Sequence, residues 1–155
     1  MAKLKRIFFG FTIVELLTVI AIIGVLSTVL ATVMNPGRQL AKARDVRRET
    51  DLIAILSTIT QYGSEHSGEL PDTDGNPATS NFPTTLTCIG TGGGCFNLAT
   101  AGETGETIVP VYMASIPKDP QTGTDGNTGY QIQVDANDRL IASASGETKT
   151  ISVTR

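Results

Sequence analysis

A run of 24 residues near the N-terminus, residues 11–34, is apolar except for one charged side chain, Glu15. As an α-helix the run extends about 36 Å, which exceeds the roughly 30 Å hydrocarbon core of a bilayer. A charge at the bilayer centre costs about 2.5–3.5 kcal/mol, and each Leu, Ile, Val or Phe residue offsets about 0.3–0.6 kcal/mol. The run contains fourteen such residues, so insertion is feasible, but the run by itself gives Glu15 no role.

Basic residues precede the apolar run. Residues 1–10 carry Lys3, Lys5 and Arg6 and no acid. This charge places the N-terminus in the cytoplasm and sends the rest of the chain outward. An ordinary secretory signal peptide is one alternative, although no A-x-A site ends the run, and a simple single-span anchor is another.

The helix is predicted to continue over residues 36–63, and this extension is amphipathic. Its apolar residues recur at spacings of three and four and share one face: Leu52, Ile55, Leu56, Ile59 and Tyr62. A weaker stripe of Leu40, Ala43 and Val46 extends this face backward. Pro36 removes one backbone hydrogen bond, so we expect a kink there between residues 11–35 and the amphipathic extension.

The rest of the chain predicts a small antiparallel sheet. Residues 64–106 are rich in Gly, Thr, Asn, Asp and Pro and are predicted to form a loop region. The head within residues 107–155 has four candidate strands, at residues 107–113, 130–134, 139–145 and 149–154. Short turns separate the last three, which predicts a meander packed on the amphipathic helix. The expected fold class is α+β.

Charge is spread unevenly along the chain. The net charge is −3, but only residues 38–51 are locally basic. We interpret this cluster as a solvated helix face, and contact with anionic lipid is the alternative. The remaining chain is acidic, so the charge gives no direct indication of nucleic-acid binding.

Two cysteines, Cys88 and Cys95, flank the glycine-rich stretch "IGTGGG". The spacing is neither a CxxC redox motif nor a zinc motif. Outside the cytoplasm it suits a small loop closed by a disulfide, and two free thiols are the alternative.

The stretch "KRIFFG" followed by "FTIVELLTVIAIIGVL" resembles the class III signal of type IV prepilins and type II secretion pseudopilins. The resemblance covers about 60 residues. It implies that a membrane prepilin peptidase cuts after Gly10, which makes residues 1–10 a leader, and N-methylates Phe11. It also implies that Glu15 pairs with the N-terminal amine of a neighbouring subunit. Such a pair in a medium of low dielectric constant favours one helix register, because an unpaired partner is heavily penalised.

The resemblance further implies a type IV pilin-like fold and a route of assembly from the membrane into a filament. The processed subunit first lies in the lipid of the cytoplasmic membrane as a single-pass protein. An assembly ATPase and an inner-membrane platform protein then extract it, with minor pilins, into a helical homopolymer outside the cell. Many family members have a proline at the position of Thr32, whereas this chain has Pro36 one helical turn later. We therefore expect a melted segment around residues 31–37 in a filament.

A stretch of the head, residues 112–134, is similar to the major pseudopilin and to related simple pilins. The matching residues are Pro117, Asp119, Pro120, Gly129 and Tyr130. In pseudopilins the neighbouring loop can hold Ca²⁺, which makes Asp119 and Asp125 the candidate ligands here. Acids that form turns are the alternative reading, because calcium prefers six to eight oxygen ligands.

These observations predict a structural protein and not an enzyme, since no phosphate loop, nucleophile–base set or metal cluster is visible and His66 stands alone. The expected function is that of a pilin, with adhesion, twitching or DNA uptake as roles. The main alternative is the major pseudopilin of a type II secretion system, and a third is a membrane-anchored binding module that does not polymerise. The cysteine pair favours a pilin, and the lack of an inserted domain in the head favours a major subunit.

Overall fold

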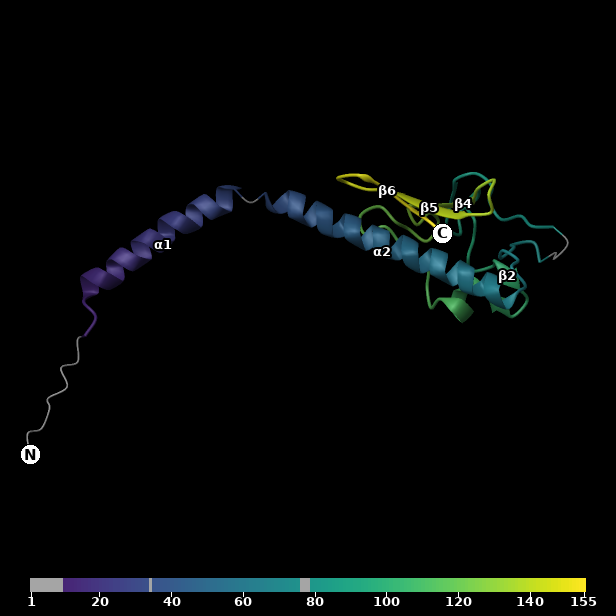
Figure 1. Cartoon of the computed structure of the whole chain (residues 1–155), viewed down its shortest axis with the longest axis horizontal. Coiled ribbons are helices and arrows are strands. Elements are labelled where there is room, and N and C mark those ends of the chain that lie inside the picture. Colours follow the sequence, from purple (N-terminus) through teal and green to yellow (C-terminus); the bar gives the residue numbers. More distant parts are fainter. Residues whose placement is uncertain (1–9, 34, 76–78) are drawn as a thin grey trace, which may run out of the picture. The chain divides into compact units, whose positions relative to one another are not determined.

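A computed structural model of the chain contains an N-terminal apolar helix followed by an α+β head (Figure 1). The structure describes residues 10–33, 35–75 and 79–155, without the side chain of Thr32. The chain divides into two units after Gly37. The elements are α1 (Ile13–Val33), α2 (Pro36–Glu65), β1 (Thr87–Cys88), β2 (Gly102–Glu103), β3 (Glu106–Thr107), η1 (Ile108–Tyr112), β4 (Tyr130–Val134), β5 (Leu140–Ser145) and β6 (Thr150–Thr154). The predicted α+β class is confirmed.

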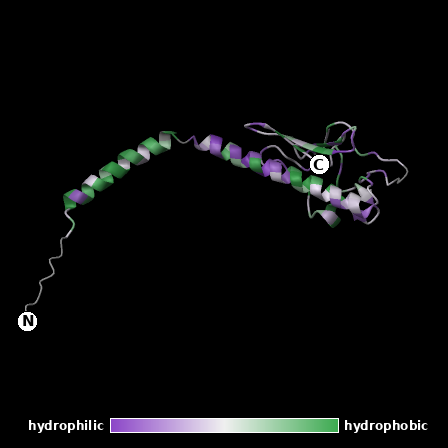
Figure 2. Cartoon of the chain, viewed as in Figure 1, coloured by the Kyte–Doolittle hydropathy of each residue, from purple (hydrophilic) through white to green (hydrophobic). Residues whose placement is uncertain are grey.

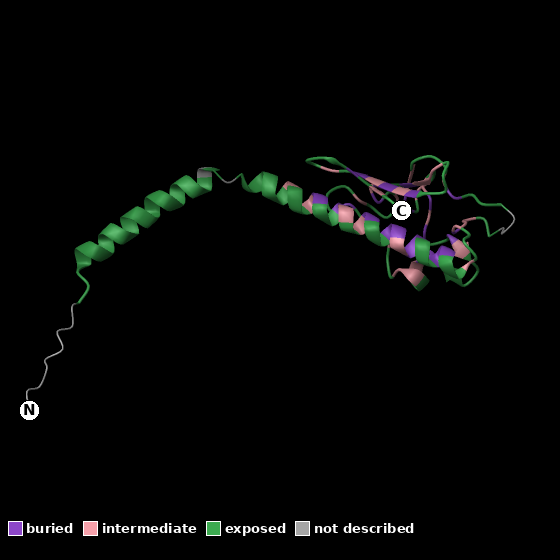
Figure 3. Cartoon of the chain, in the orientation of Figure 1, coloured by how far each residue is buried: buried purple, intermediate pink, exposed green. Residues whose placement is uncertain are grey.

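The first helix, α1, is apolar along its length and exposed on all sides (Figures 2 and 3). The hydroxyl groups of Thr18, Ser27 and Thr28 are satisfied inside the helix, since they donate to the carbonyls of Val14, Ile23 and Gly24 at 2.8, 2.7 and 2.9 Å. Such bonds to the preceding turn hide polar side chains from an apolar medium. The stretch Ile13–Ala31 is long and apolar enough to cross a membrane.

The two helices are separate elements. The first ends at Val33 and α2 begins at Pro36, with Asn35 outside both. Proline is favoured in the first turn of a helix, where the N–H group that it lacks has no partner within the helix. The structure thus corrects the prediction of one helix kinked at Pro36, because Pro36 starts the second helix. The expected melted segment of a filament, residues 31–37, includes Met34, which lies outside the described residues.

The core of the head forms between one face of α2 and the sheet (Figure 3). Four side chains of the predicted stripe are completely buried: Leu52, Ile55, Leu56 and Ile59. The weaker stripe is not covered by the head, since Leu40 is 59% and Val46 is 63% exposed and Ala43 is also exposed. The weaker stripe therefore lies outside the buried face, which Arg48 and Asp45 continue toward the start of α2.

The main sheet has the strand order β1–β4–β5–β6, and its ladders are antiparallel. Tyr130 pairs with Ala144 and Ile132 pairs with Ala142, and all four side chains are buried. Because side chains alternate between the faces of a strand, this register directs one set toward α2. The predicted meander of the last three strands is confirmed.

The segment 107–113 is not a strand. Thr107 closes the short β2–β3 ladder, and η1 then makes a single wide turn in which the N–H of Met113 donates to the carbonyl of Ile108 at 3.0 Å. The segment contains Pro110, which has no N–H to donate to a ladder and follows a cis peptide bond. Apolar composition predicted a strand here, but the proline excludes a central one.

Candidate functional site

The residues around the expected cleavage point lie ahead of α1 in non-helical backbone. Gly10 and Phe11 are exposed, and the side chain of Phe11 is 80% exposed. The helix begins two residues after Phe11. The Gly10–Phe11 peptide bond is therefore outside regular structure and accessible, as a protease substrate requires. The basic residues Lys3, Lys5 and Arg6 lie outside the described residues.

Thr12 and Glu15 form a reciprocal cap at the start of α1. The backbone N–H of Thr12 donates to Oε2 of Glu15 at 2.9 Å, and the N–H of Glu15 donates to the hydroxyl of Thr12 at 3.2 Å. The Thr12 hydroxyl also donates to Oε2 at 2.9 Å. This geometry is a capping box, which satisfies two backbone donors that the first helical turn leaves open. Glu15 therefore has a local structural role besides any role in assembly.

The capping box was missed in the sequence, although its signal is present. Thr12, Ile13, Val14 and Glu15 fit the pattern of Ser or Thr followed three residues later by Glu, directly before an apolar run. We considered Glu15 only as a solitary charge and did not predict its contact with Thr12. The pattern also fixes the start of the helix at Ile13, so the carboxylate lies in the first turn, next to the bond that processing is expected to cut.

The head is held to α2 by a buried guanidinium. Arg48 is 2% exposed, and its Nε donates to Oδ2 of Asp119 at 2.5 Å. Its Nη1 donates to Oδ1 of Asp45 at 2.8 Å and to Oε1 of Glu147 at 3.1 Å. The group thus joins α2 to the loop after η1 and to the β5–β6 turn. The prediction of a solvated basic face is wrong for Arg48, whereas Lys42 and Arg47 are exposed.

The partners of Arg48 are themselves fully engaged. Asp45 accepts hydrogen bonds from the N–H groups of Glu147 and Thr148, both at 2.8 Å. The β5–β6 turn lies so close that a Cβ atom at Gly146 would stand 2.9 Å from Oδ1 of Asp45, which leaves room for glycine only. The hydroxyl of Thr148, together with these N–H groups, holds the pKa of Asp45 well below its usual range.

Asp119 and Asp125 do not form a common site. Both oxygens of Asp119 accept hydrogen bonds, from Arg48 and from the N–H groups of Gln121 and Thr122 at 2.8 and 2.9 Å. Burial acts to raise the pKa of Asp119, but these donors outweigh it and hold the pKa well below the usual range. Asp125 is exposed and pairs with Lys118 at 2.6 Å.

Calcium binding by Asp119 and Asp125 stays a prediction, and the two residues have different partners in the structure. Asp119 anchors the head to α2, and a guanidinium beside a carboxylate repels a second cation. In the described ranges 10–33, 35–75 and 79–155, no group of three or more His, Cys, Asp or Glu side chains is arranged to hold a metal ion.

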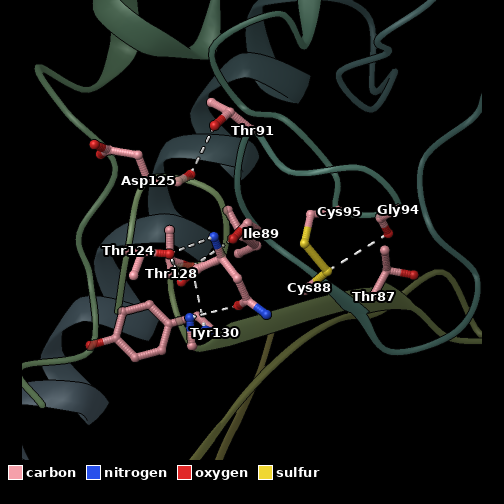
Figure 4. Close-up of a disulfide and its surroundings, with 12 residues drawn as sticks. Thr87, Cys88, Ile89, Thr91, Gly94, Cys95, Thr124, Asp125, Thr128 and Tyr130 are labelled. Atoms are coloured by element: carbon pink, nitrogen blue, oxygen red, sulfur yellow. Dashed lines mark hydrogen bonds between the residues drawn. A yellow bond between two sulfur atoms is a disulfide. The ribbon is translucent and has the colours of Figure 1, made fainter. Parts of the chain in front are cut away.

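Cys88 and Cys95 are joined by a disulfide that closes the glycine-rich loop (Figure 4). Cys88 ends β1, and the N–H of Phe96 donates to its carbonyl at 2.7 Å. The loop is tied to the 122–128 loop, because the N–H of Thr91 donates to the carbonyl of Asp125 at 2.9 Å and its hydroxyl donates to the same carbonyl at 3.1 Å (Figure 4). The disulfide lies at the edge of the sheet, because β1 is an edge strand, and it fixes a surface loop there.

His66 lies beyond the end of α2, stacked on Tyr62 with the ring centroids 3.9 Å apart. Its Nδ1 donates to the carbonyl of Tyr62 at 2.9 Å, and its Nε2 lies 3.2 Å from Oε2 of Glu106. The Tyr62 carbonyl raises the pKa of His66 above its ordinary value, and the charges of Glu103 and Glu106 act in the same direction.

We expect an NMR titration of this imidazole, the single histidine of the chain, to give a pKa above 6.5. Since the folded state binds the proton more tightly, the stabilisation is complete below pH 6.5 and is lost as the pH rises through the folded-state pKa. Glu106→Gln should lower the pKa. A value at or below 6.5 in the unmodified chain would contradict this assignment.

No protein-family model, curated protein or solved structure matches the chain.

Proposed function

We propose that the protein is the major structural subunit of a type IV pilus-like surface filament. One observation carries the proposal. The apolar helix α1 is exposed on all sides and has the carboxylate of Glu15 in its first turn, four residues after the exposed Phe11. A membrane anchor needs the apolar helix but not the carboxylate. A polymer subunit uses both, because the charge selects how neighbouring helices align.

The proposed chemistry begins with cleavage after Gly10 by a membrane prepilin peptidase, followed by N-methylation of Phe11. Cleavage creates a cationic amine at Phe11, two residues before the first helical turn, in which Glu15 lies. In the filament the carboxylate of one subunit pairs with the amine of the next. Because both charges leave water, only a close pair is tolerated, and other helix registers are disfavoured.

The exposed apolar surface of α1 then packs against other copies of α1 instead of lipid. Side chains such as Leu16, Ile20 and Ile23 are more than half exposed in the single chain and supply this surface. The proposed partners are other subunits, minor pilins, the platform protein and the assembly ATPase. The subunit is proposed to await assembly in the cytoplasmic membrane with its N-terminus in the cytoplasm.

A role as the major pseudopilin of a type II secretion system is the second candidate. The stretch around Pro117 and Pro120, which Asp119 anchors to Arg48, is similar to both classes of protein and does not separate them. The disulfide-closed loop of Cys88 and Cys95 favours the pilus.

The test is to analyse sheared cell-surface material by mass spectrometry and electron microscopy. We expect filaments built from a chain that begins with N-methyl-Phe11. A chain that starts at Met1 would contradict the processing. A processed chain with no surface filaments would exclude the pilus and favour the pseudopilus.

A further inference from the structure

Charges of opposite sign are segregated along residues 38–117 of the head, whereas both signs are mixed from Lys118 onward. Residues 38–48 contain five basic residues and one acid, whereas residues 49–117 contain eight acids and no lysine or arginine. The first region is the start of α2. The second includes the end of α2 and the loops around it. Such segregation creates two surfaces of opposite potential on one subunit.

The basic surface is formed by Lys42 and Arg47 together with the apolar side chains of Leu40 and Val46. All four are exposed, and the two apolar side chains are 59% and 63% exposed. Within the part of the chain that the structure describes, Lys42 and Arg47 form no ion pair, in contrast to Arg44 and Arg48. The surface thus combines unpaired cations with uncovered apolar groups, as an interface does.

The acidic surface lies at the other end of α2 and comprises Glu65, Glu69, Glu103 and Glu106, all exposed. It borders a hollow of about 450 Å³, whose walls include Tyr62, Glu69 and Glu103. Asp72 also lines the hollow, and its Oδ2 has no hydrogen-bond donor among the described residues. The acids are not grouped to hold a metal ion in that part of the chain, so a partner with spread positive charge fits them better.

The two surfaces cannot meet within one subunit. Lys42 and Glu65 lie on one continuous helix, 23 residues apart, which corresponds to about 35 Å. Two different, complementary surfaces on identical subunits make a head-to-tail contact, and a head-to-tail contact that does not close into a ring generates a helical filament.

We propose that the acidic surface of one head docks on the basic surface of a neighbouring copy of this chain. The inference rests on the proposed filament and names a contact between heads that is additional to the pairing of Glu15. The attraction aligns successive heads, and the apolar groups around Lys42 and Arg47 are covered by the neighbour. Because the charges lie near the filament surface, salt weakens the contact.

The test is a charge swap in cells that assemble the filament. Lys42→Glu with Arg47→Glu should reduce the yield of sheared filaments about tenfold or more, since like charges then face each other. Glu69→Lys with Glu103→Lys should have a similar effect. All four substitutions together should restore most of the yield. The matched control is Arg139→Glu with Arg155→Glu, which makes the same change in charge just before β5 and just after β6. It breaks only the exposed pair of Arg139 with Asp135 and should leave the yield unchanged.

A second measurement tests contact directly. A carbodiimide links an amine to a carboxylate only when the two touch. It should join Lys42 to Glu69 or Glu103 in assembled filaments and not in subunits dispersed in detergent. Because these residues are far apart within one chain, the link must join two subunits.

The outcomes separate this inference from the proposed function. Wild-type yield in both reversed variants, without the cross-link, overturns the head contact while leaving the filament in place. Loss of filaments without rescue by the four-fold variant also overturns it, and indicates that Lys42 and Arg47 contact anionic lipid instead. If the unmodified chain forms no filament, both proposals fall.

Discussion

Replacement of Arg48 by methionine is expected to lower the free energy of unfolding of the head by about 3–5 kcal/mol, the usual cost of removing one partner from a buried ion pair. The substitution keeps the length of the side chain and removes its charge. Asp119 and Asp45 then remain in the interior with fewer hydrogen-bond donors. Burying an anion without a compensating charge is much more costly than losing the attraction of the pair itself.

The measurement is urea unfolding of the full chain in detergent, followed by tyrosine fluorescence. The chain has three tyrosines and no tryptophan, and Tyr62, Tyr112 and Tyr130 all lie in the head, so the signal reports this unit. A lower midpoint with an unchanged slope would show a change in stability alone.

Arg44→Met is the matched control, one helical turn earlier. Arg44 pairs with Glu147 at 2.5 Å, but its side chain is 31% exposed, so water compensates for most of the lost contact. Its effect should therefore be a small part of that of Arg48→Met. Equal effects of the two substitutions would contradict a special role for the buried guanidinium.

Replacement of Glu15 by glutamine is expected to reduce filament assembly about a hundredfold while leaving the helix intact, because the amine of the neighbour then lacks its counter-charge. Glutamine can still accept the hydrogen bond from the N–H of Thr12, and the capping box accepts either residue. The variant therefore separates the charge of Glu15 from its capping role. Assembly is measured as filament mass sheared from equal numbers of cells.

Thr12→Ala tests the opposite case, in which the cap is weakened and the charge is kept. It removes the hydroxyl that caps the N–H of Glu15 but keeps the carboxylate. Loss of such a cap costs a helix about 1 kcal/mol, so assembly should fall far less than with Glu15→Gln. If Thr12→Ala abolished filaments and Glu15→Gln did not, capping would be the function of Glu15 and the intersubunit pair would be refuted.

The sequence predicted the helices and strands correctly where a single local pattern of side chains determines them. The period of Leu52, Ile55, Leu56 and Ile59 predicted the buried face of α2, and alternation predicted β4–β6. The prediction of a strand was wrong at residues 107–113, because it rested on apolar composition and neglected Pro110, which has no N–H for a strand ladder. Leu40 and Val46 are exposed because the buried face of α2 continues toward its start through Arg48 and Asp45, both 2% exposed.

The functional residues could be predicted only in part, because some of them depend on contacts between distant parts of the chain. The position of Glu15 within an apolar run is a property of the sequence, and so is the capping pattern that it forms with Thr12. The role of Arg48 is not, since its partners Asp119 and Glu147 are 71 and 99 residues away. The spacing of Arg48 four residues before Leu52 places it on the buried face of α2, but the sequence does not show which acids neutralise it there.

The sequence by itself determined the apolar helix, its single carboxylate and the meander, because these depend on the hydrogen bonds and side-chain periods of neighbouring residues. Only the tertiary structure decided which charges are buried and which remain exposed. It assigned Asp119 to Arg48 rather than to a shared site with Asp125, and it left Lys42 and Arg47 uncovered. The physical reason is that a buried charge requires a partner in space, and the chain brings such partners together only when the sheet closes on α2.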